Sequence, residues 1–187
     1  MKNFAFLAGL SRQVSALRRD QKGVSAVEFA MVLPLMITLY VGAVEVSQGV
    51  AIQRKITLTA RTVADLASQA TSINNADMTN LGNAALRVIE PYPSGPLKGS
   101  VSAVNIDANG IARIAWSDPV NGGAAKAVNS TVTVPTALSV PNSQLIWSEV
   151  NYKYTPDFGG SMVGEINLYE QIYMRPRLSE TVARSSS

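Results

Sequence analysis

An uncharged run of 16 residues, Phe29–Val44, is the feature that most constrains this 187-residue chain. Extended back to Val24, the apolar stretch covers 21 residues and is interrupted by a single charge, Glu28. A helix of about 20 apolar residues crosses the roughly 30 Å hydrocarbon core of a bilayer. The sequence therefore predicts a transmembrane helix over residues 24–44.

The charges on the two sides of this run differ. The first 23 residues carry five basic side chains against one acidic one, whereas residues 46–187 carry 11 basic and 10 acidic ones. Short segments rich in Lys and Arg stay on the cytoplasmic side of a membrane. We therefore expect a basic cytoplasmic leader at residues 1–23 and an exported remainder. The net charge of +3 is too small to indicate nucleic-acid binding.

The composition excludes most catalytic chemistry. The chain has no Cys and no His, which removes thiolate nucleophiles, imidazole proton shuttles and most zinc sites. The remaining candidates for a carboxylate pair lie within 22 residues and are Glu149, Asp157, Glu165 and Glu170. Acids in such a region are usually solvated charges, so a membrane-tethered enzyme is the least favoured hypothesis. We expect no enzymatic activity, no catalytic residue, no metal and no cofactor.

The spacing around Glu28 resembles a known processing site. Glu28 is the fifth residue after Gly23, inside the string GVSAVEF that ends at Phe29. A Gly followed by an apolar run with Glu at position five resembles the type IV prepilin site, which a membrane-embedded aspartyl peptidase cuts.

A longer stretch carries a more specific resemblance. The basic leader, the AVEF string, Pro34 within the apolar run and a second acid at Glu45 occur together between Lys22 and about Arg61. This combination is similar to the TadE-like family of the tight adherence (Tad, or Flp) pilus system. TadE and TadF proteins are alike in this region, so the sequence does not separate the two types.

The resemblance implies a minor pseudopilin that acts in the assembly or initiation of a Tad/Flp pilus for adhesion. It implies cleavage between Gly23 and Val24, with Glu28 and Phe29 completing the processing site. The implied partners are a prepilin peptidase, other Tad pilins and pseudopilins, the inner-membrane platform of the machine and the lipid bilayer. The implied location is the inner membrane, crossed once, with the N-terminus cytoplasmic and the C-terminal domain periplasmic, or the pilus itself.

Glu28, Pro34 and Glu45 are the candidate assembly residues. Cleavage would create an α-amino group at Val24, four residues before Glu28 and on the same helix face. The two charges would neutralise one another, or Glu28 would reach the amine of a neighbouring subunit and set the register. Alternatively, Glu28 only extends to the cytoplasmic headgroups. Pro34 either kinks the span or loosens the helix for packing.

A conventional signal peptide is the alternative interpretation. Val41-Gly42-Ala43 fits the small-residue pattern of a secretory cleavage site. Cleavage after Ala43 would release a secreted or surface adhesion module that begins at Val44. The long leader and the acid at Glu28 count against this hypothesis, and the mature N-terminus distinguishes the two.

The periodicity beyond residue 44 predicts an α+β fold. Apolar residues continue at helical spacing, which predicts one helix over residues 24–70 with its 45–70 part outside the membrane. A second short helix is expected from Asp77 to Ile89. The period then changes to two, and the expected strands cover residues 101–106, 111–116, 146–154 and 166–174. We predict an exported α+β domain at residues 71–187, with a small antiparallel sheet packed on the helix as in pilins, a flexible connection at 118–129 and a frayed tail from Ser179.

Overall fold

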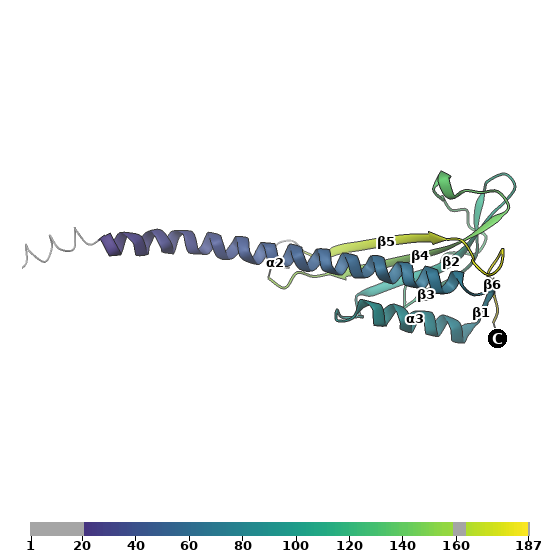
Figure 1. Cartoon of the computed structure of the whole chain (residues 1–187), viewed down its shortest axis with the longest axis horizontal. Coiled ribbons are helices and arrows are strands. Elements are labelled where there is room, and N and C mark those ends of the chain that lie inside the picture. Colours follow the sequence, from purple (N-terminus) through teal and green to yellow (C-terminus); the bar gives the residue numbers. More distant parts are fainter. Residues whose placement is uncertain (1–20, 159–163, 187) are drawn as a thin grey trace, which may run out of the picture. The chain divides into compact units, whose positions relative to one another are not determined.

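A computed structural model describes residues 21–158 and 164–186, so most of the predicted leader lies outside the described residues. The chain divides into two compact units, residues 1–44 and residues 45–187. One helix, α2 (Gln21–Ser68), supplies residues to both units (Figure 1). The predicted uninterrupted helix is therefore confirmed, and its ends lie within three residues of those expected.

Four antiparallel strands form the main sheet of the 45–187 unit, in the order β3-β2-β4-β5 (Figure 1). They are β2 (Leu97–Ile106), β3 (Ala112–Val120), β4 (Ser143–Tyr154) and β5 (Ile166–Met174). Strand β2 begins four residues earlier than expected, and β3 ends four residues later. The added end residues Leu97 and Val120 are buried, so packing extends both strands. The connection predicted from residue 118 therefore starts only after Val120.

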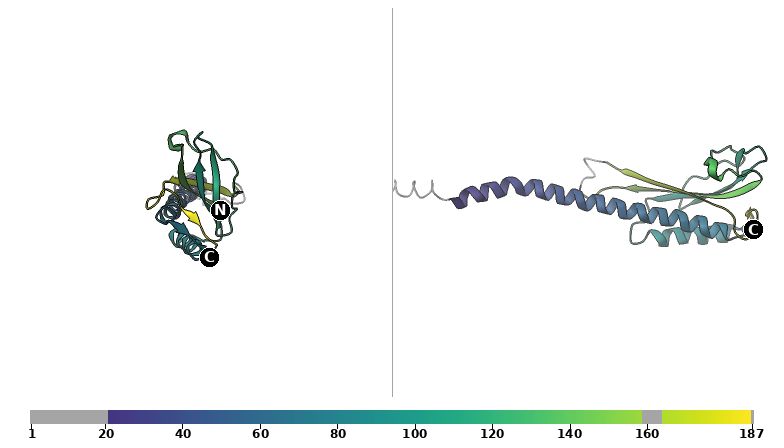
Figure 2. Two further views of the ribbon diagram at one scale, coloured as in Figure 1. Left: turned by 90° about the vertical axis from the view of Figure 1, so that its right-hand side faces the viewer. Right: turned by 45° about the horizontal axis from the view of Figure 1, so that its top comes forward.

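One face of the sheet packs on α2 and on α3 (Asn75–Ile89), as the views of Figures 1 and 2 show. The side chains of this core come from all three layers: Ile52, Ile56, Ala60, Val63 and Ala67 from α2, Leu81, Ala85 and Ile89 from α3, and Val101, Ala103, Trp116, Ile146, Val150, Tyr152 and Tyr154 from the sheet. The fold is thus α+β, a long N-terminal helix packed with a small antiparallel sheet, consistent with a pilin-like fold.

Helix α3 begins with a capping box. The Asn74 side-chain oxygen accepts a hydrogen bond from the Asp77 backbone N–H at 2.9 Å, and the Asp77 carboxylate accepts one from the Asn74 N–H at 3.0 Å. These bonds satisfy donors that a helix N-terminus otherwise leaves free. The helix therefore starts two residues before the predicted Asp77.

The opposite face of the sheet carries a second, smaller apolar cluster. Val104, Ile114, Leu145 and Trp147 belong to it. The connection from β3 to β4, which contains the short 3₁₀ helix η1 (Thr136–Leu138), covers the cluster with partly buried apolar side chains. The sheet face that carries this cluster is therefore shielded from water.

The C-terminal segment is docked, so the prediction of a frayed tail from Ser179 is wrong. Val182 is 1% exposed, and its carbonyl accepts a hydrogen bond from the Trp116 indole at 2.8 Å. Two short strands, β1 (Ser72–Ile73) and β6 (Ala183–Arg184), pair in parallel. The Arg184 guanidinium also binds the Asp118 carboxylate at 2.8 Å. One buried Val and one ion pair order a segment whose sequence is mostly polar.

Candidate functional site

The predicted processing residues lie on one exposed helical segment. Gly23, Val24, Glu28 and Phe29 belong to the first turns of α2, and all four are exposed. A Cβ placed on Gly23 would meet no described atom within 4 Å. Val24 and Glu28 are four residues apart and therefore share a helix face. The structure brings these residues together, and their roles in processing remain predictions.

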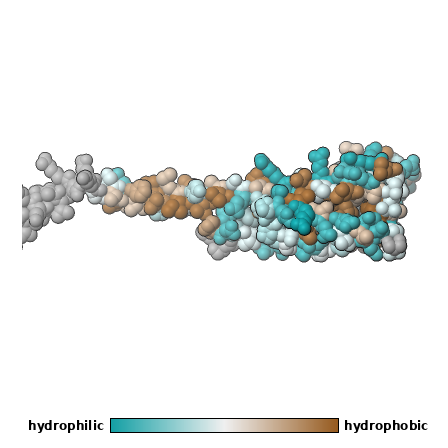
Figure 3. Space-filling model, turned by 60° about the horizontal axis from the view of Figure 1, so that its bottom comes forward, coloured by the Kyte–Doolittle hydropathy of each residue, from teal (hydrophilic) through white to brown (hydrophobic). Residues whose placement is uncertain are grey.

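The apolar side chains of α2 before residue 45 are mostly exposed. Phe29 is 65% exposed, Leu35 60%, Met36 61% and Leu39 65%. Figure 3 shows a mostly brown, hydrophobic stretch of surface on this part of the helix. A continuous apolar surface of this kind is unfavourable in water. Among the described residues, one helix is long and apolar enough to cross a membrane, and it covers Gly23–Ser68.

Pro34 lies inside α2 without ending it. Proline has no backbone N–H, so the helix loses one internal hydrogen bond at this position. The Thr38 hydroxyl donates to the Pro34 carbonyl at 2.8 Å, which gives this hydroxyl a partner within the apolar run. The helix continues through the proline on both sides.

Glu45 is the first residue of the 45–187 unit and holds the chain that follows β4. The hydroxyl of Tyr154, the last residue of β4, donates to Glu45 Oε2 at 2.6 Å. The backbone N–H of Phe158 donates to Glu45 Oε1 at 2.9 Å. The Tyr154 ring packs one turn further along α2, where a Cβ on Gly49 would lie 3.7 Å from Tyr154 Cε1. Both carboxylate oxygens of Glu45 are thus committed to residues more than 100 positions away.

These contacts shift the ionisation of both side chains. The hydrogen bond from Tyr154 lowers the pKa of Glu45 below its usual value, and backbone hydrogen bonds from Phe158 and Asp157 lower it further. Burial raises the pKa of Tyr154 well above its usual value, and the bond to Glu45 adds to that rise. Glu45 is therefore charged and Tyr154 neutral at pH 7, the pairing in which a hydroxyl donates to a carboxylate.

A second polar contact fixes α2 to the edge of the sheet. Glu170, on the side of β5 that faces α2, accepts a hydrogen bond from the Thr57 hydroxyl at 2.8 Å and one from the Gln53 amide at 3.5 Å. Near the end of α2, Arg177 forms a 2.6 Å ion pair with Asp65. The part of α2 within the 45–187 unit is therefore held along its length.

Three of the four acids considered for catalysis have separate partners in the structure. Glu149 lies on the sheet face opposite α2, bound to Lys126 at 2.6 Å and to the Tyr169 hydroxyl at 2.7 Å, whereas Glu170 faces the helix. Glu165 pairs with Lys153 at 3.7 Å. Among the residues that the structure describes, no group of three or more acidic side chains is placed to hold a metal ion. The arrangement supports structural roles for these acids.

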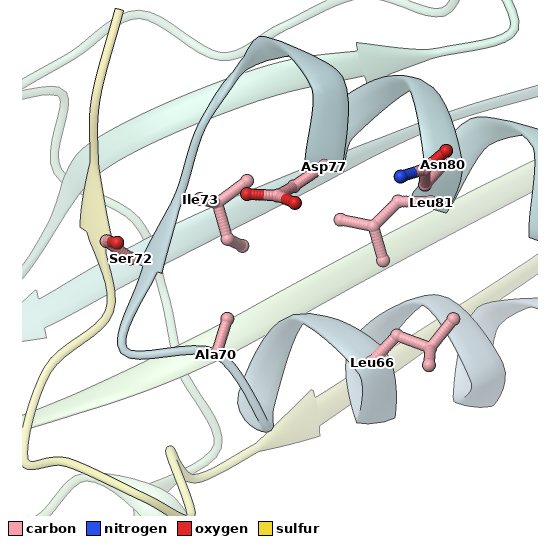
Figure 4. A pocket seen from close by; sticks show the side chains of 7 residues that line it. All are labelled: Leu66, Ala70, Ser72, Ile73, Asp77, Asn80 and Leu81. Atoms are coloured by element: carbon pink, nitrogen blue, oxygen red, sulfur yellow. The ribbon is translucent and has the colours of Figure 1, made fainter. Parts of the chain in front are cut away.

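A shallow cavity of about 250 Å³ lies between the end of α2 and the start of α3 (Figure 4). Its wall is mostly apolar, from Leu66, Ala70, Ile73 and Leu81. Its one charged lining residue, Asp77, already accepts the capping hydrogen bond from the Asn74 N–H. The one charged side chain of the cavity is therefore already engaged in the cap of α3.

The sequence did not indicate what Glu45 contacts. Its position directly after the apolar run drew attention to it, but its partners Tyr154 and Phe158 carry no local signal. The alternation of β4 places Tyr154 on the face toward the helix, as it does Tyr152. The position of β4 along the axis of α2 determines which of these two tyrosines contacts the Glu45 carboxylate.

The comparisons with known proteins agree with the resemblance found in the sequence. The family model described as TadE-like protein matches residues 23–65. No curated protein and no solved structure matches the chain. The matched range contains every predicted processing and assembly residue, from Gly23 to Glu45. The resemblance is therefore confirmed over this range: residues 23–65 are similar to the TadE-like family of the Tad pilus system.

Proposed function

We propose that this protein is a minor pilin-like subunit that acts in the assembly or initiation of a Tad/Flp pilus. The observation that carries the proposal is the TadE-like match over residues 23–65, in which Glu28 follows Gly23 by five positions on an exposed helix. The protein acts by assembling with other subunits and performs no chemical reaction. Its partners are a prepilin peptidase, other Tad pilins and pseudopilins, and the inner-membrane platform.

The proposed topology follows from the charge distribution. The basic leader at 1–23 stays in the cytoplasm, residues 24–44 cross the inner membrane, and residues 45–187 lie in the periplasm. Within the periplasmic part, the helix continues to about residue 70 and the α+β domain follows. The apolar exposure of α2 before residue 45 supports this division.

Glu28 is proposed to act after cleavage. Removal of the leader after Gly23 gives Val24 a charged α-amino group, and Glu28 lies one helical turn away. A carboxylate inside an apolar span is unfavourable unless it is paired. Pairing with the amine of the same or a neighbouring subunit would neutralise both charges and fix the axial position of the subunit.

The cleavage site is tested by exchanging the residue before each candidate cut. Gly23→Leu should leave a full-length precursor, because a peptidase site that accepts glycine excludes a large side chain. Ala43→Leu, the matched control in the same helix, should be processed normally to an N-terminus at Val24. Precursor accumulation with Ala43→Leu, and an N-terminus at Val44 with Gly23→Leu, would instead establish a conventional signal peptide and a released module.

The role of Glu28 is tested separately from cleavage. Glu28→Gln removes the charge, so the protein should insert and be at least partly cut but fail to join the pilus complex. An ammonium left unpaired in a packed apolar bundle costs several kcal/mol, so the loss of piliation should be large. Glu28→Asp, which keeps the charge, is the control. Mass spectrometry reports cleavage, and co-purification with pilus components reports assembly. Normal piliation with Glu28→Gln would contradict the pairing.

A further inference from the structure

The turn after β4, residues 155–158, is fixed beside the first residue that follows the predicted span. Glu45 follows Val44, the last residue of the uncharged run, directly in the chain. Its carboxylate accepts hydrogen bonds from the Tyr154 hydroxyl at 2.6 Å and from the Phe158 backbone N–H at 2.9 Å. The backbone of Phe158 is thus held beside the first residue beyond the span.

The side chain of Phe158 points away from the protein core. It is 73% exposed, the largest exposed fraction among the phenylalanine, tyrosine and tryptophan side chains of the 45–187 unit that the structure describes. A single exposed apolar residue is ordinary on a protein surface. Phe158 differs from such residues because its backbone N–H is bound by Glu45. Glu45 is charged and directly follows the apolar span.

The length of the span places Glu45 at the outer edge of the bilayer. Twenty-one helical residues at 1.5 Å each cover about 31 Å, close to the roughly 30 Å of the hydrocarbon core. A charged carboxylate remains outside that core because its burial there is costly. Glu45, and with it the Phe158 backbone, therefore lies at the level of the headgroups.

Tyr and Trp side chains are enriched at this level of membrane proteins, and Phe occurs on the apolar faces of helices that lie in the interface. Tyr40 provides one from α2 itself, within the last five residues of the span, and is 72% exposed. Phe158 would provide a second from a segment more than 100 residues later in the sequence. The transfer of a phenyl ring from water to the boundary between headgroups and acyl chains lowers its free energy.

We propose that the turn after β4 is a membrane-surface contact, in which Phe158 inserts into the headgroup region of the lipid bilayer and Glu45 holds it in place. The contact would give the 45–187 unit an attachment to the lipid surface in addition to α2. This inference rests on the proposed membrane span and goes beyond it.

Single-cysteine spin labelling tests the inference on the full chain, which has no native cysteine. Phe158→Cys is labelled in vesicles of phosphatidylcholine and phosphatidylglycerol, and collisions with oxygen, which is enriched in lipid, are compared with those of a water-soluble nickel complex. Leu178→Cys, a site that is 70% exposed, is the matched aqueous control, and Met36→Cys is the control for the span. The oxygen-to-nickel ratio should be several-fold higher at 158 and at 36 than at 178.

The outcomes separate the inference from the span. A low ratio at 36 would overturn the span and the inference with it. A high ratio at 36 with equal, low ratios at 158 and 178 would overturn the inference alone. A label at position 158 that collides with neither oxygen nor the nickel complex would also overturn the inference, because it would show that protein covers this position. Adding Glu45→Ala to Phe158→Cys should lower the ratio at 158 to that at 178, and an unchanged ratio would refute the role of Glu45.

Discussion

Truncating one buried side chain in the C-terminal segment should destabilise the whole 45–187 unit. Val182 is 1% exposed and packs in the main core, and its backbone N–H donates to Gln144 Oε1 at 2.6 Å. Val182→Ala removes two methyl groups, each worth about 0.8 kcal/mol of burial. The cavity left behind adds to this cost. We expect the free energy of unfolding to fall by about 2 kcal/mol.

Thermal unfolding of the full chain in mild detergent measures this change. A unit of this size loses about 3 to 5 °C of melting temperature per kcal/mol, so Val182→Ala should melt about 6 to 10 °C lower. Intrinsic fluorescence reports the transition, because the Trp116 indole donates to the Val182 carbonyl at 2.8 Å. The control is Leu178→Ala, which alters an apolar side chain that is 70% exposed in the same segment.

Leu178→Ala should change stability by no more than about 0.5 kcal/mol, as substitutions at exposed positions usually do. The melting temperature of Val182→Ala should therefore lie clearly below that of Leu178→Ala. Equal melting temperatures for Val182→Ala and the wild type would refute the docked tail and restore the frayed tail expected from the sequence.

Two further predictions address the sheet and the Glu45 contact. Gly123→Ala would place a Cβ 1.9 Å from the Gly99 carbonyl oxygen and should destabilise the unit by about 1–3 kcal/mol or more, whereas Gly95→Ala, with no described atom within 4 Å, should be nearly neutral in the same melting assay. Tyr154→Phe should lower the melting temperature most near pH 7: since folding lowers the pKa of Glu45, the stability from this contact is present above the usual value of 4.5 and is lost as the pH falls below it. A difference from the wild type that stays constant between pH 7 and pH 3 would contradict this assignment.

The sequence by itself determined the elements whose signal is local. The uncharged run and the absence of proline between Pro34 and Pro91 predicted α2 to within three residues at each end. The alternation of β5 gave its observed bounds, Ile166–Met174. The string around Glu28 indicated a resemblance to the TadE-like family, which the match over residues 23–65 then confirmed for that range. Helical and strand periodicity, and a motif within seven residues, are properties of neighbouring positions.

Tertiary structure alone decided the contacts between distant segments. Glu45 meets Tyr154 across 109 positions, and Val182 orders a tail whose composition favours solvent. Strands β1 and β6 have two residues each, too few to show a period. The pairing register of the sheet and the packing of α2 on it place these groups side by side. No local pattern encodes such proximity, because it depends on how all the elements pack together.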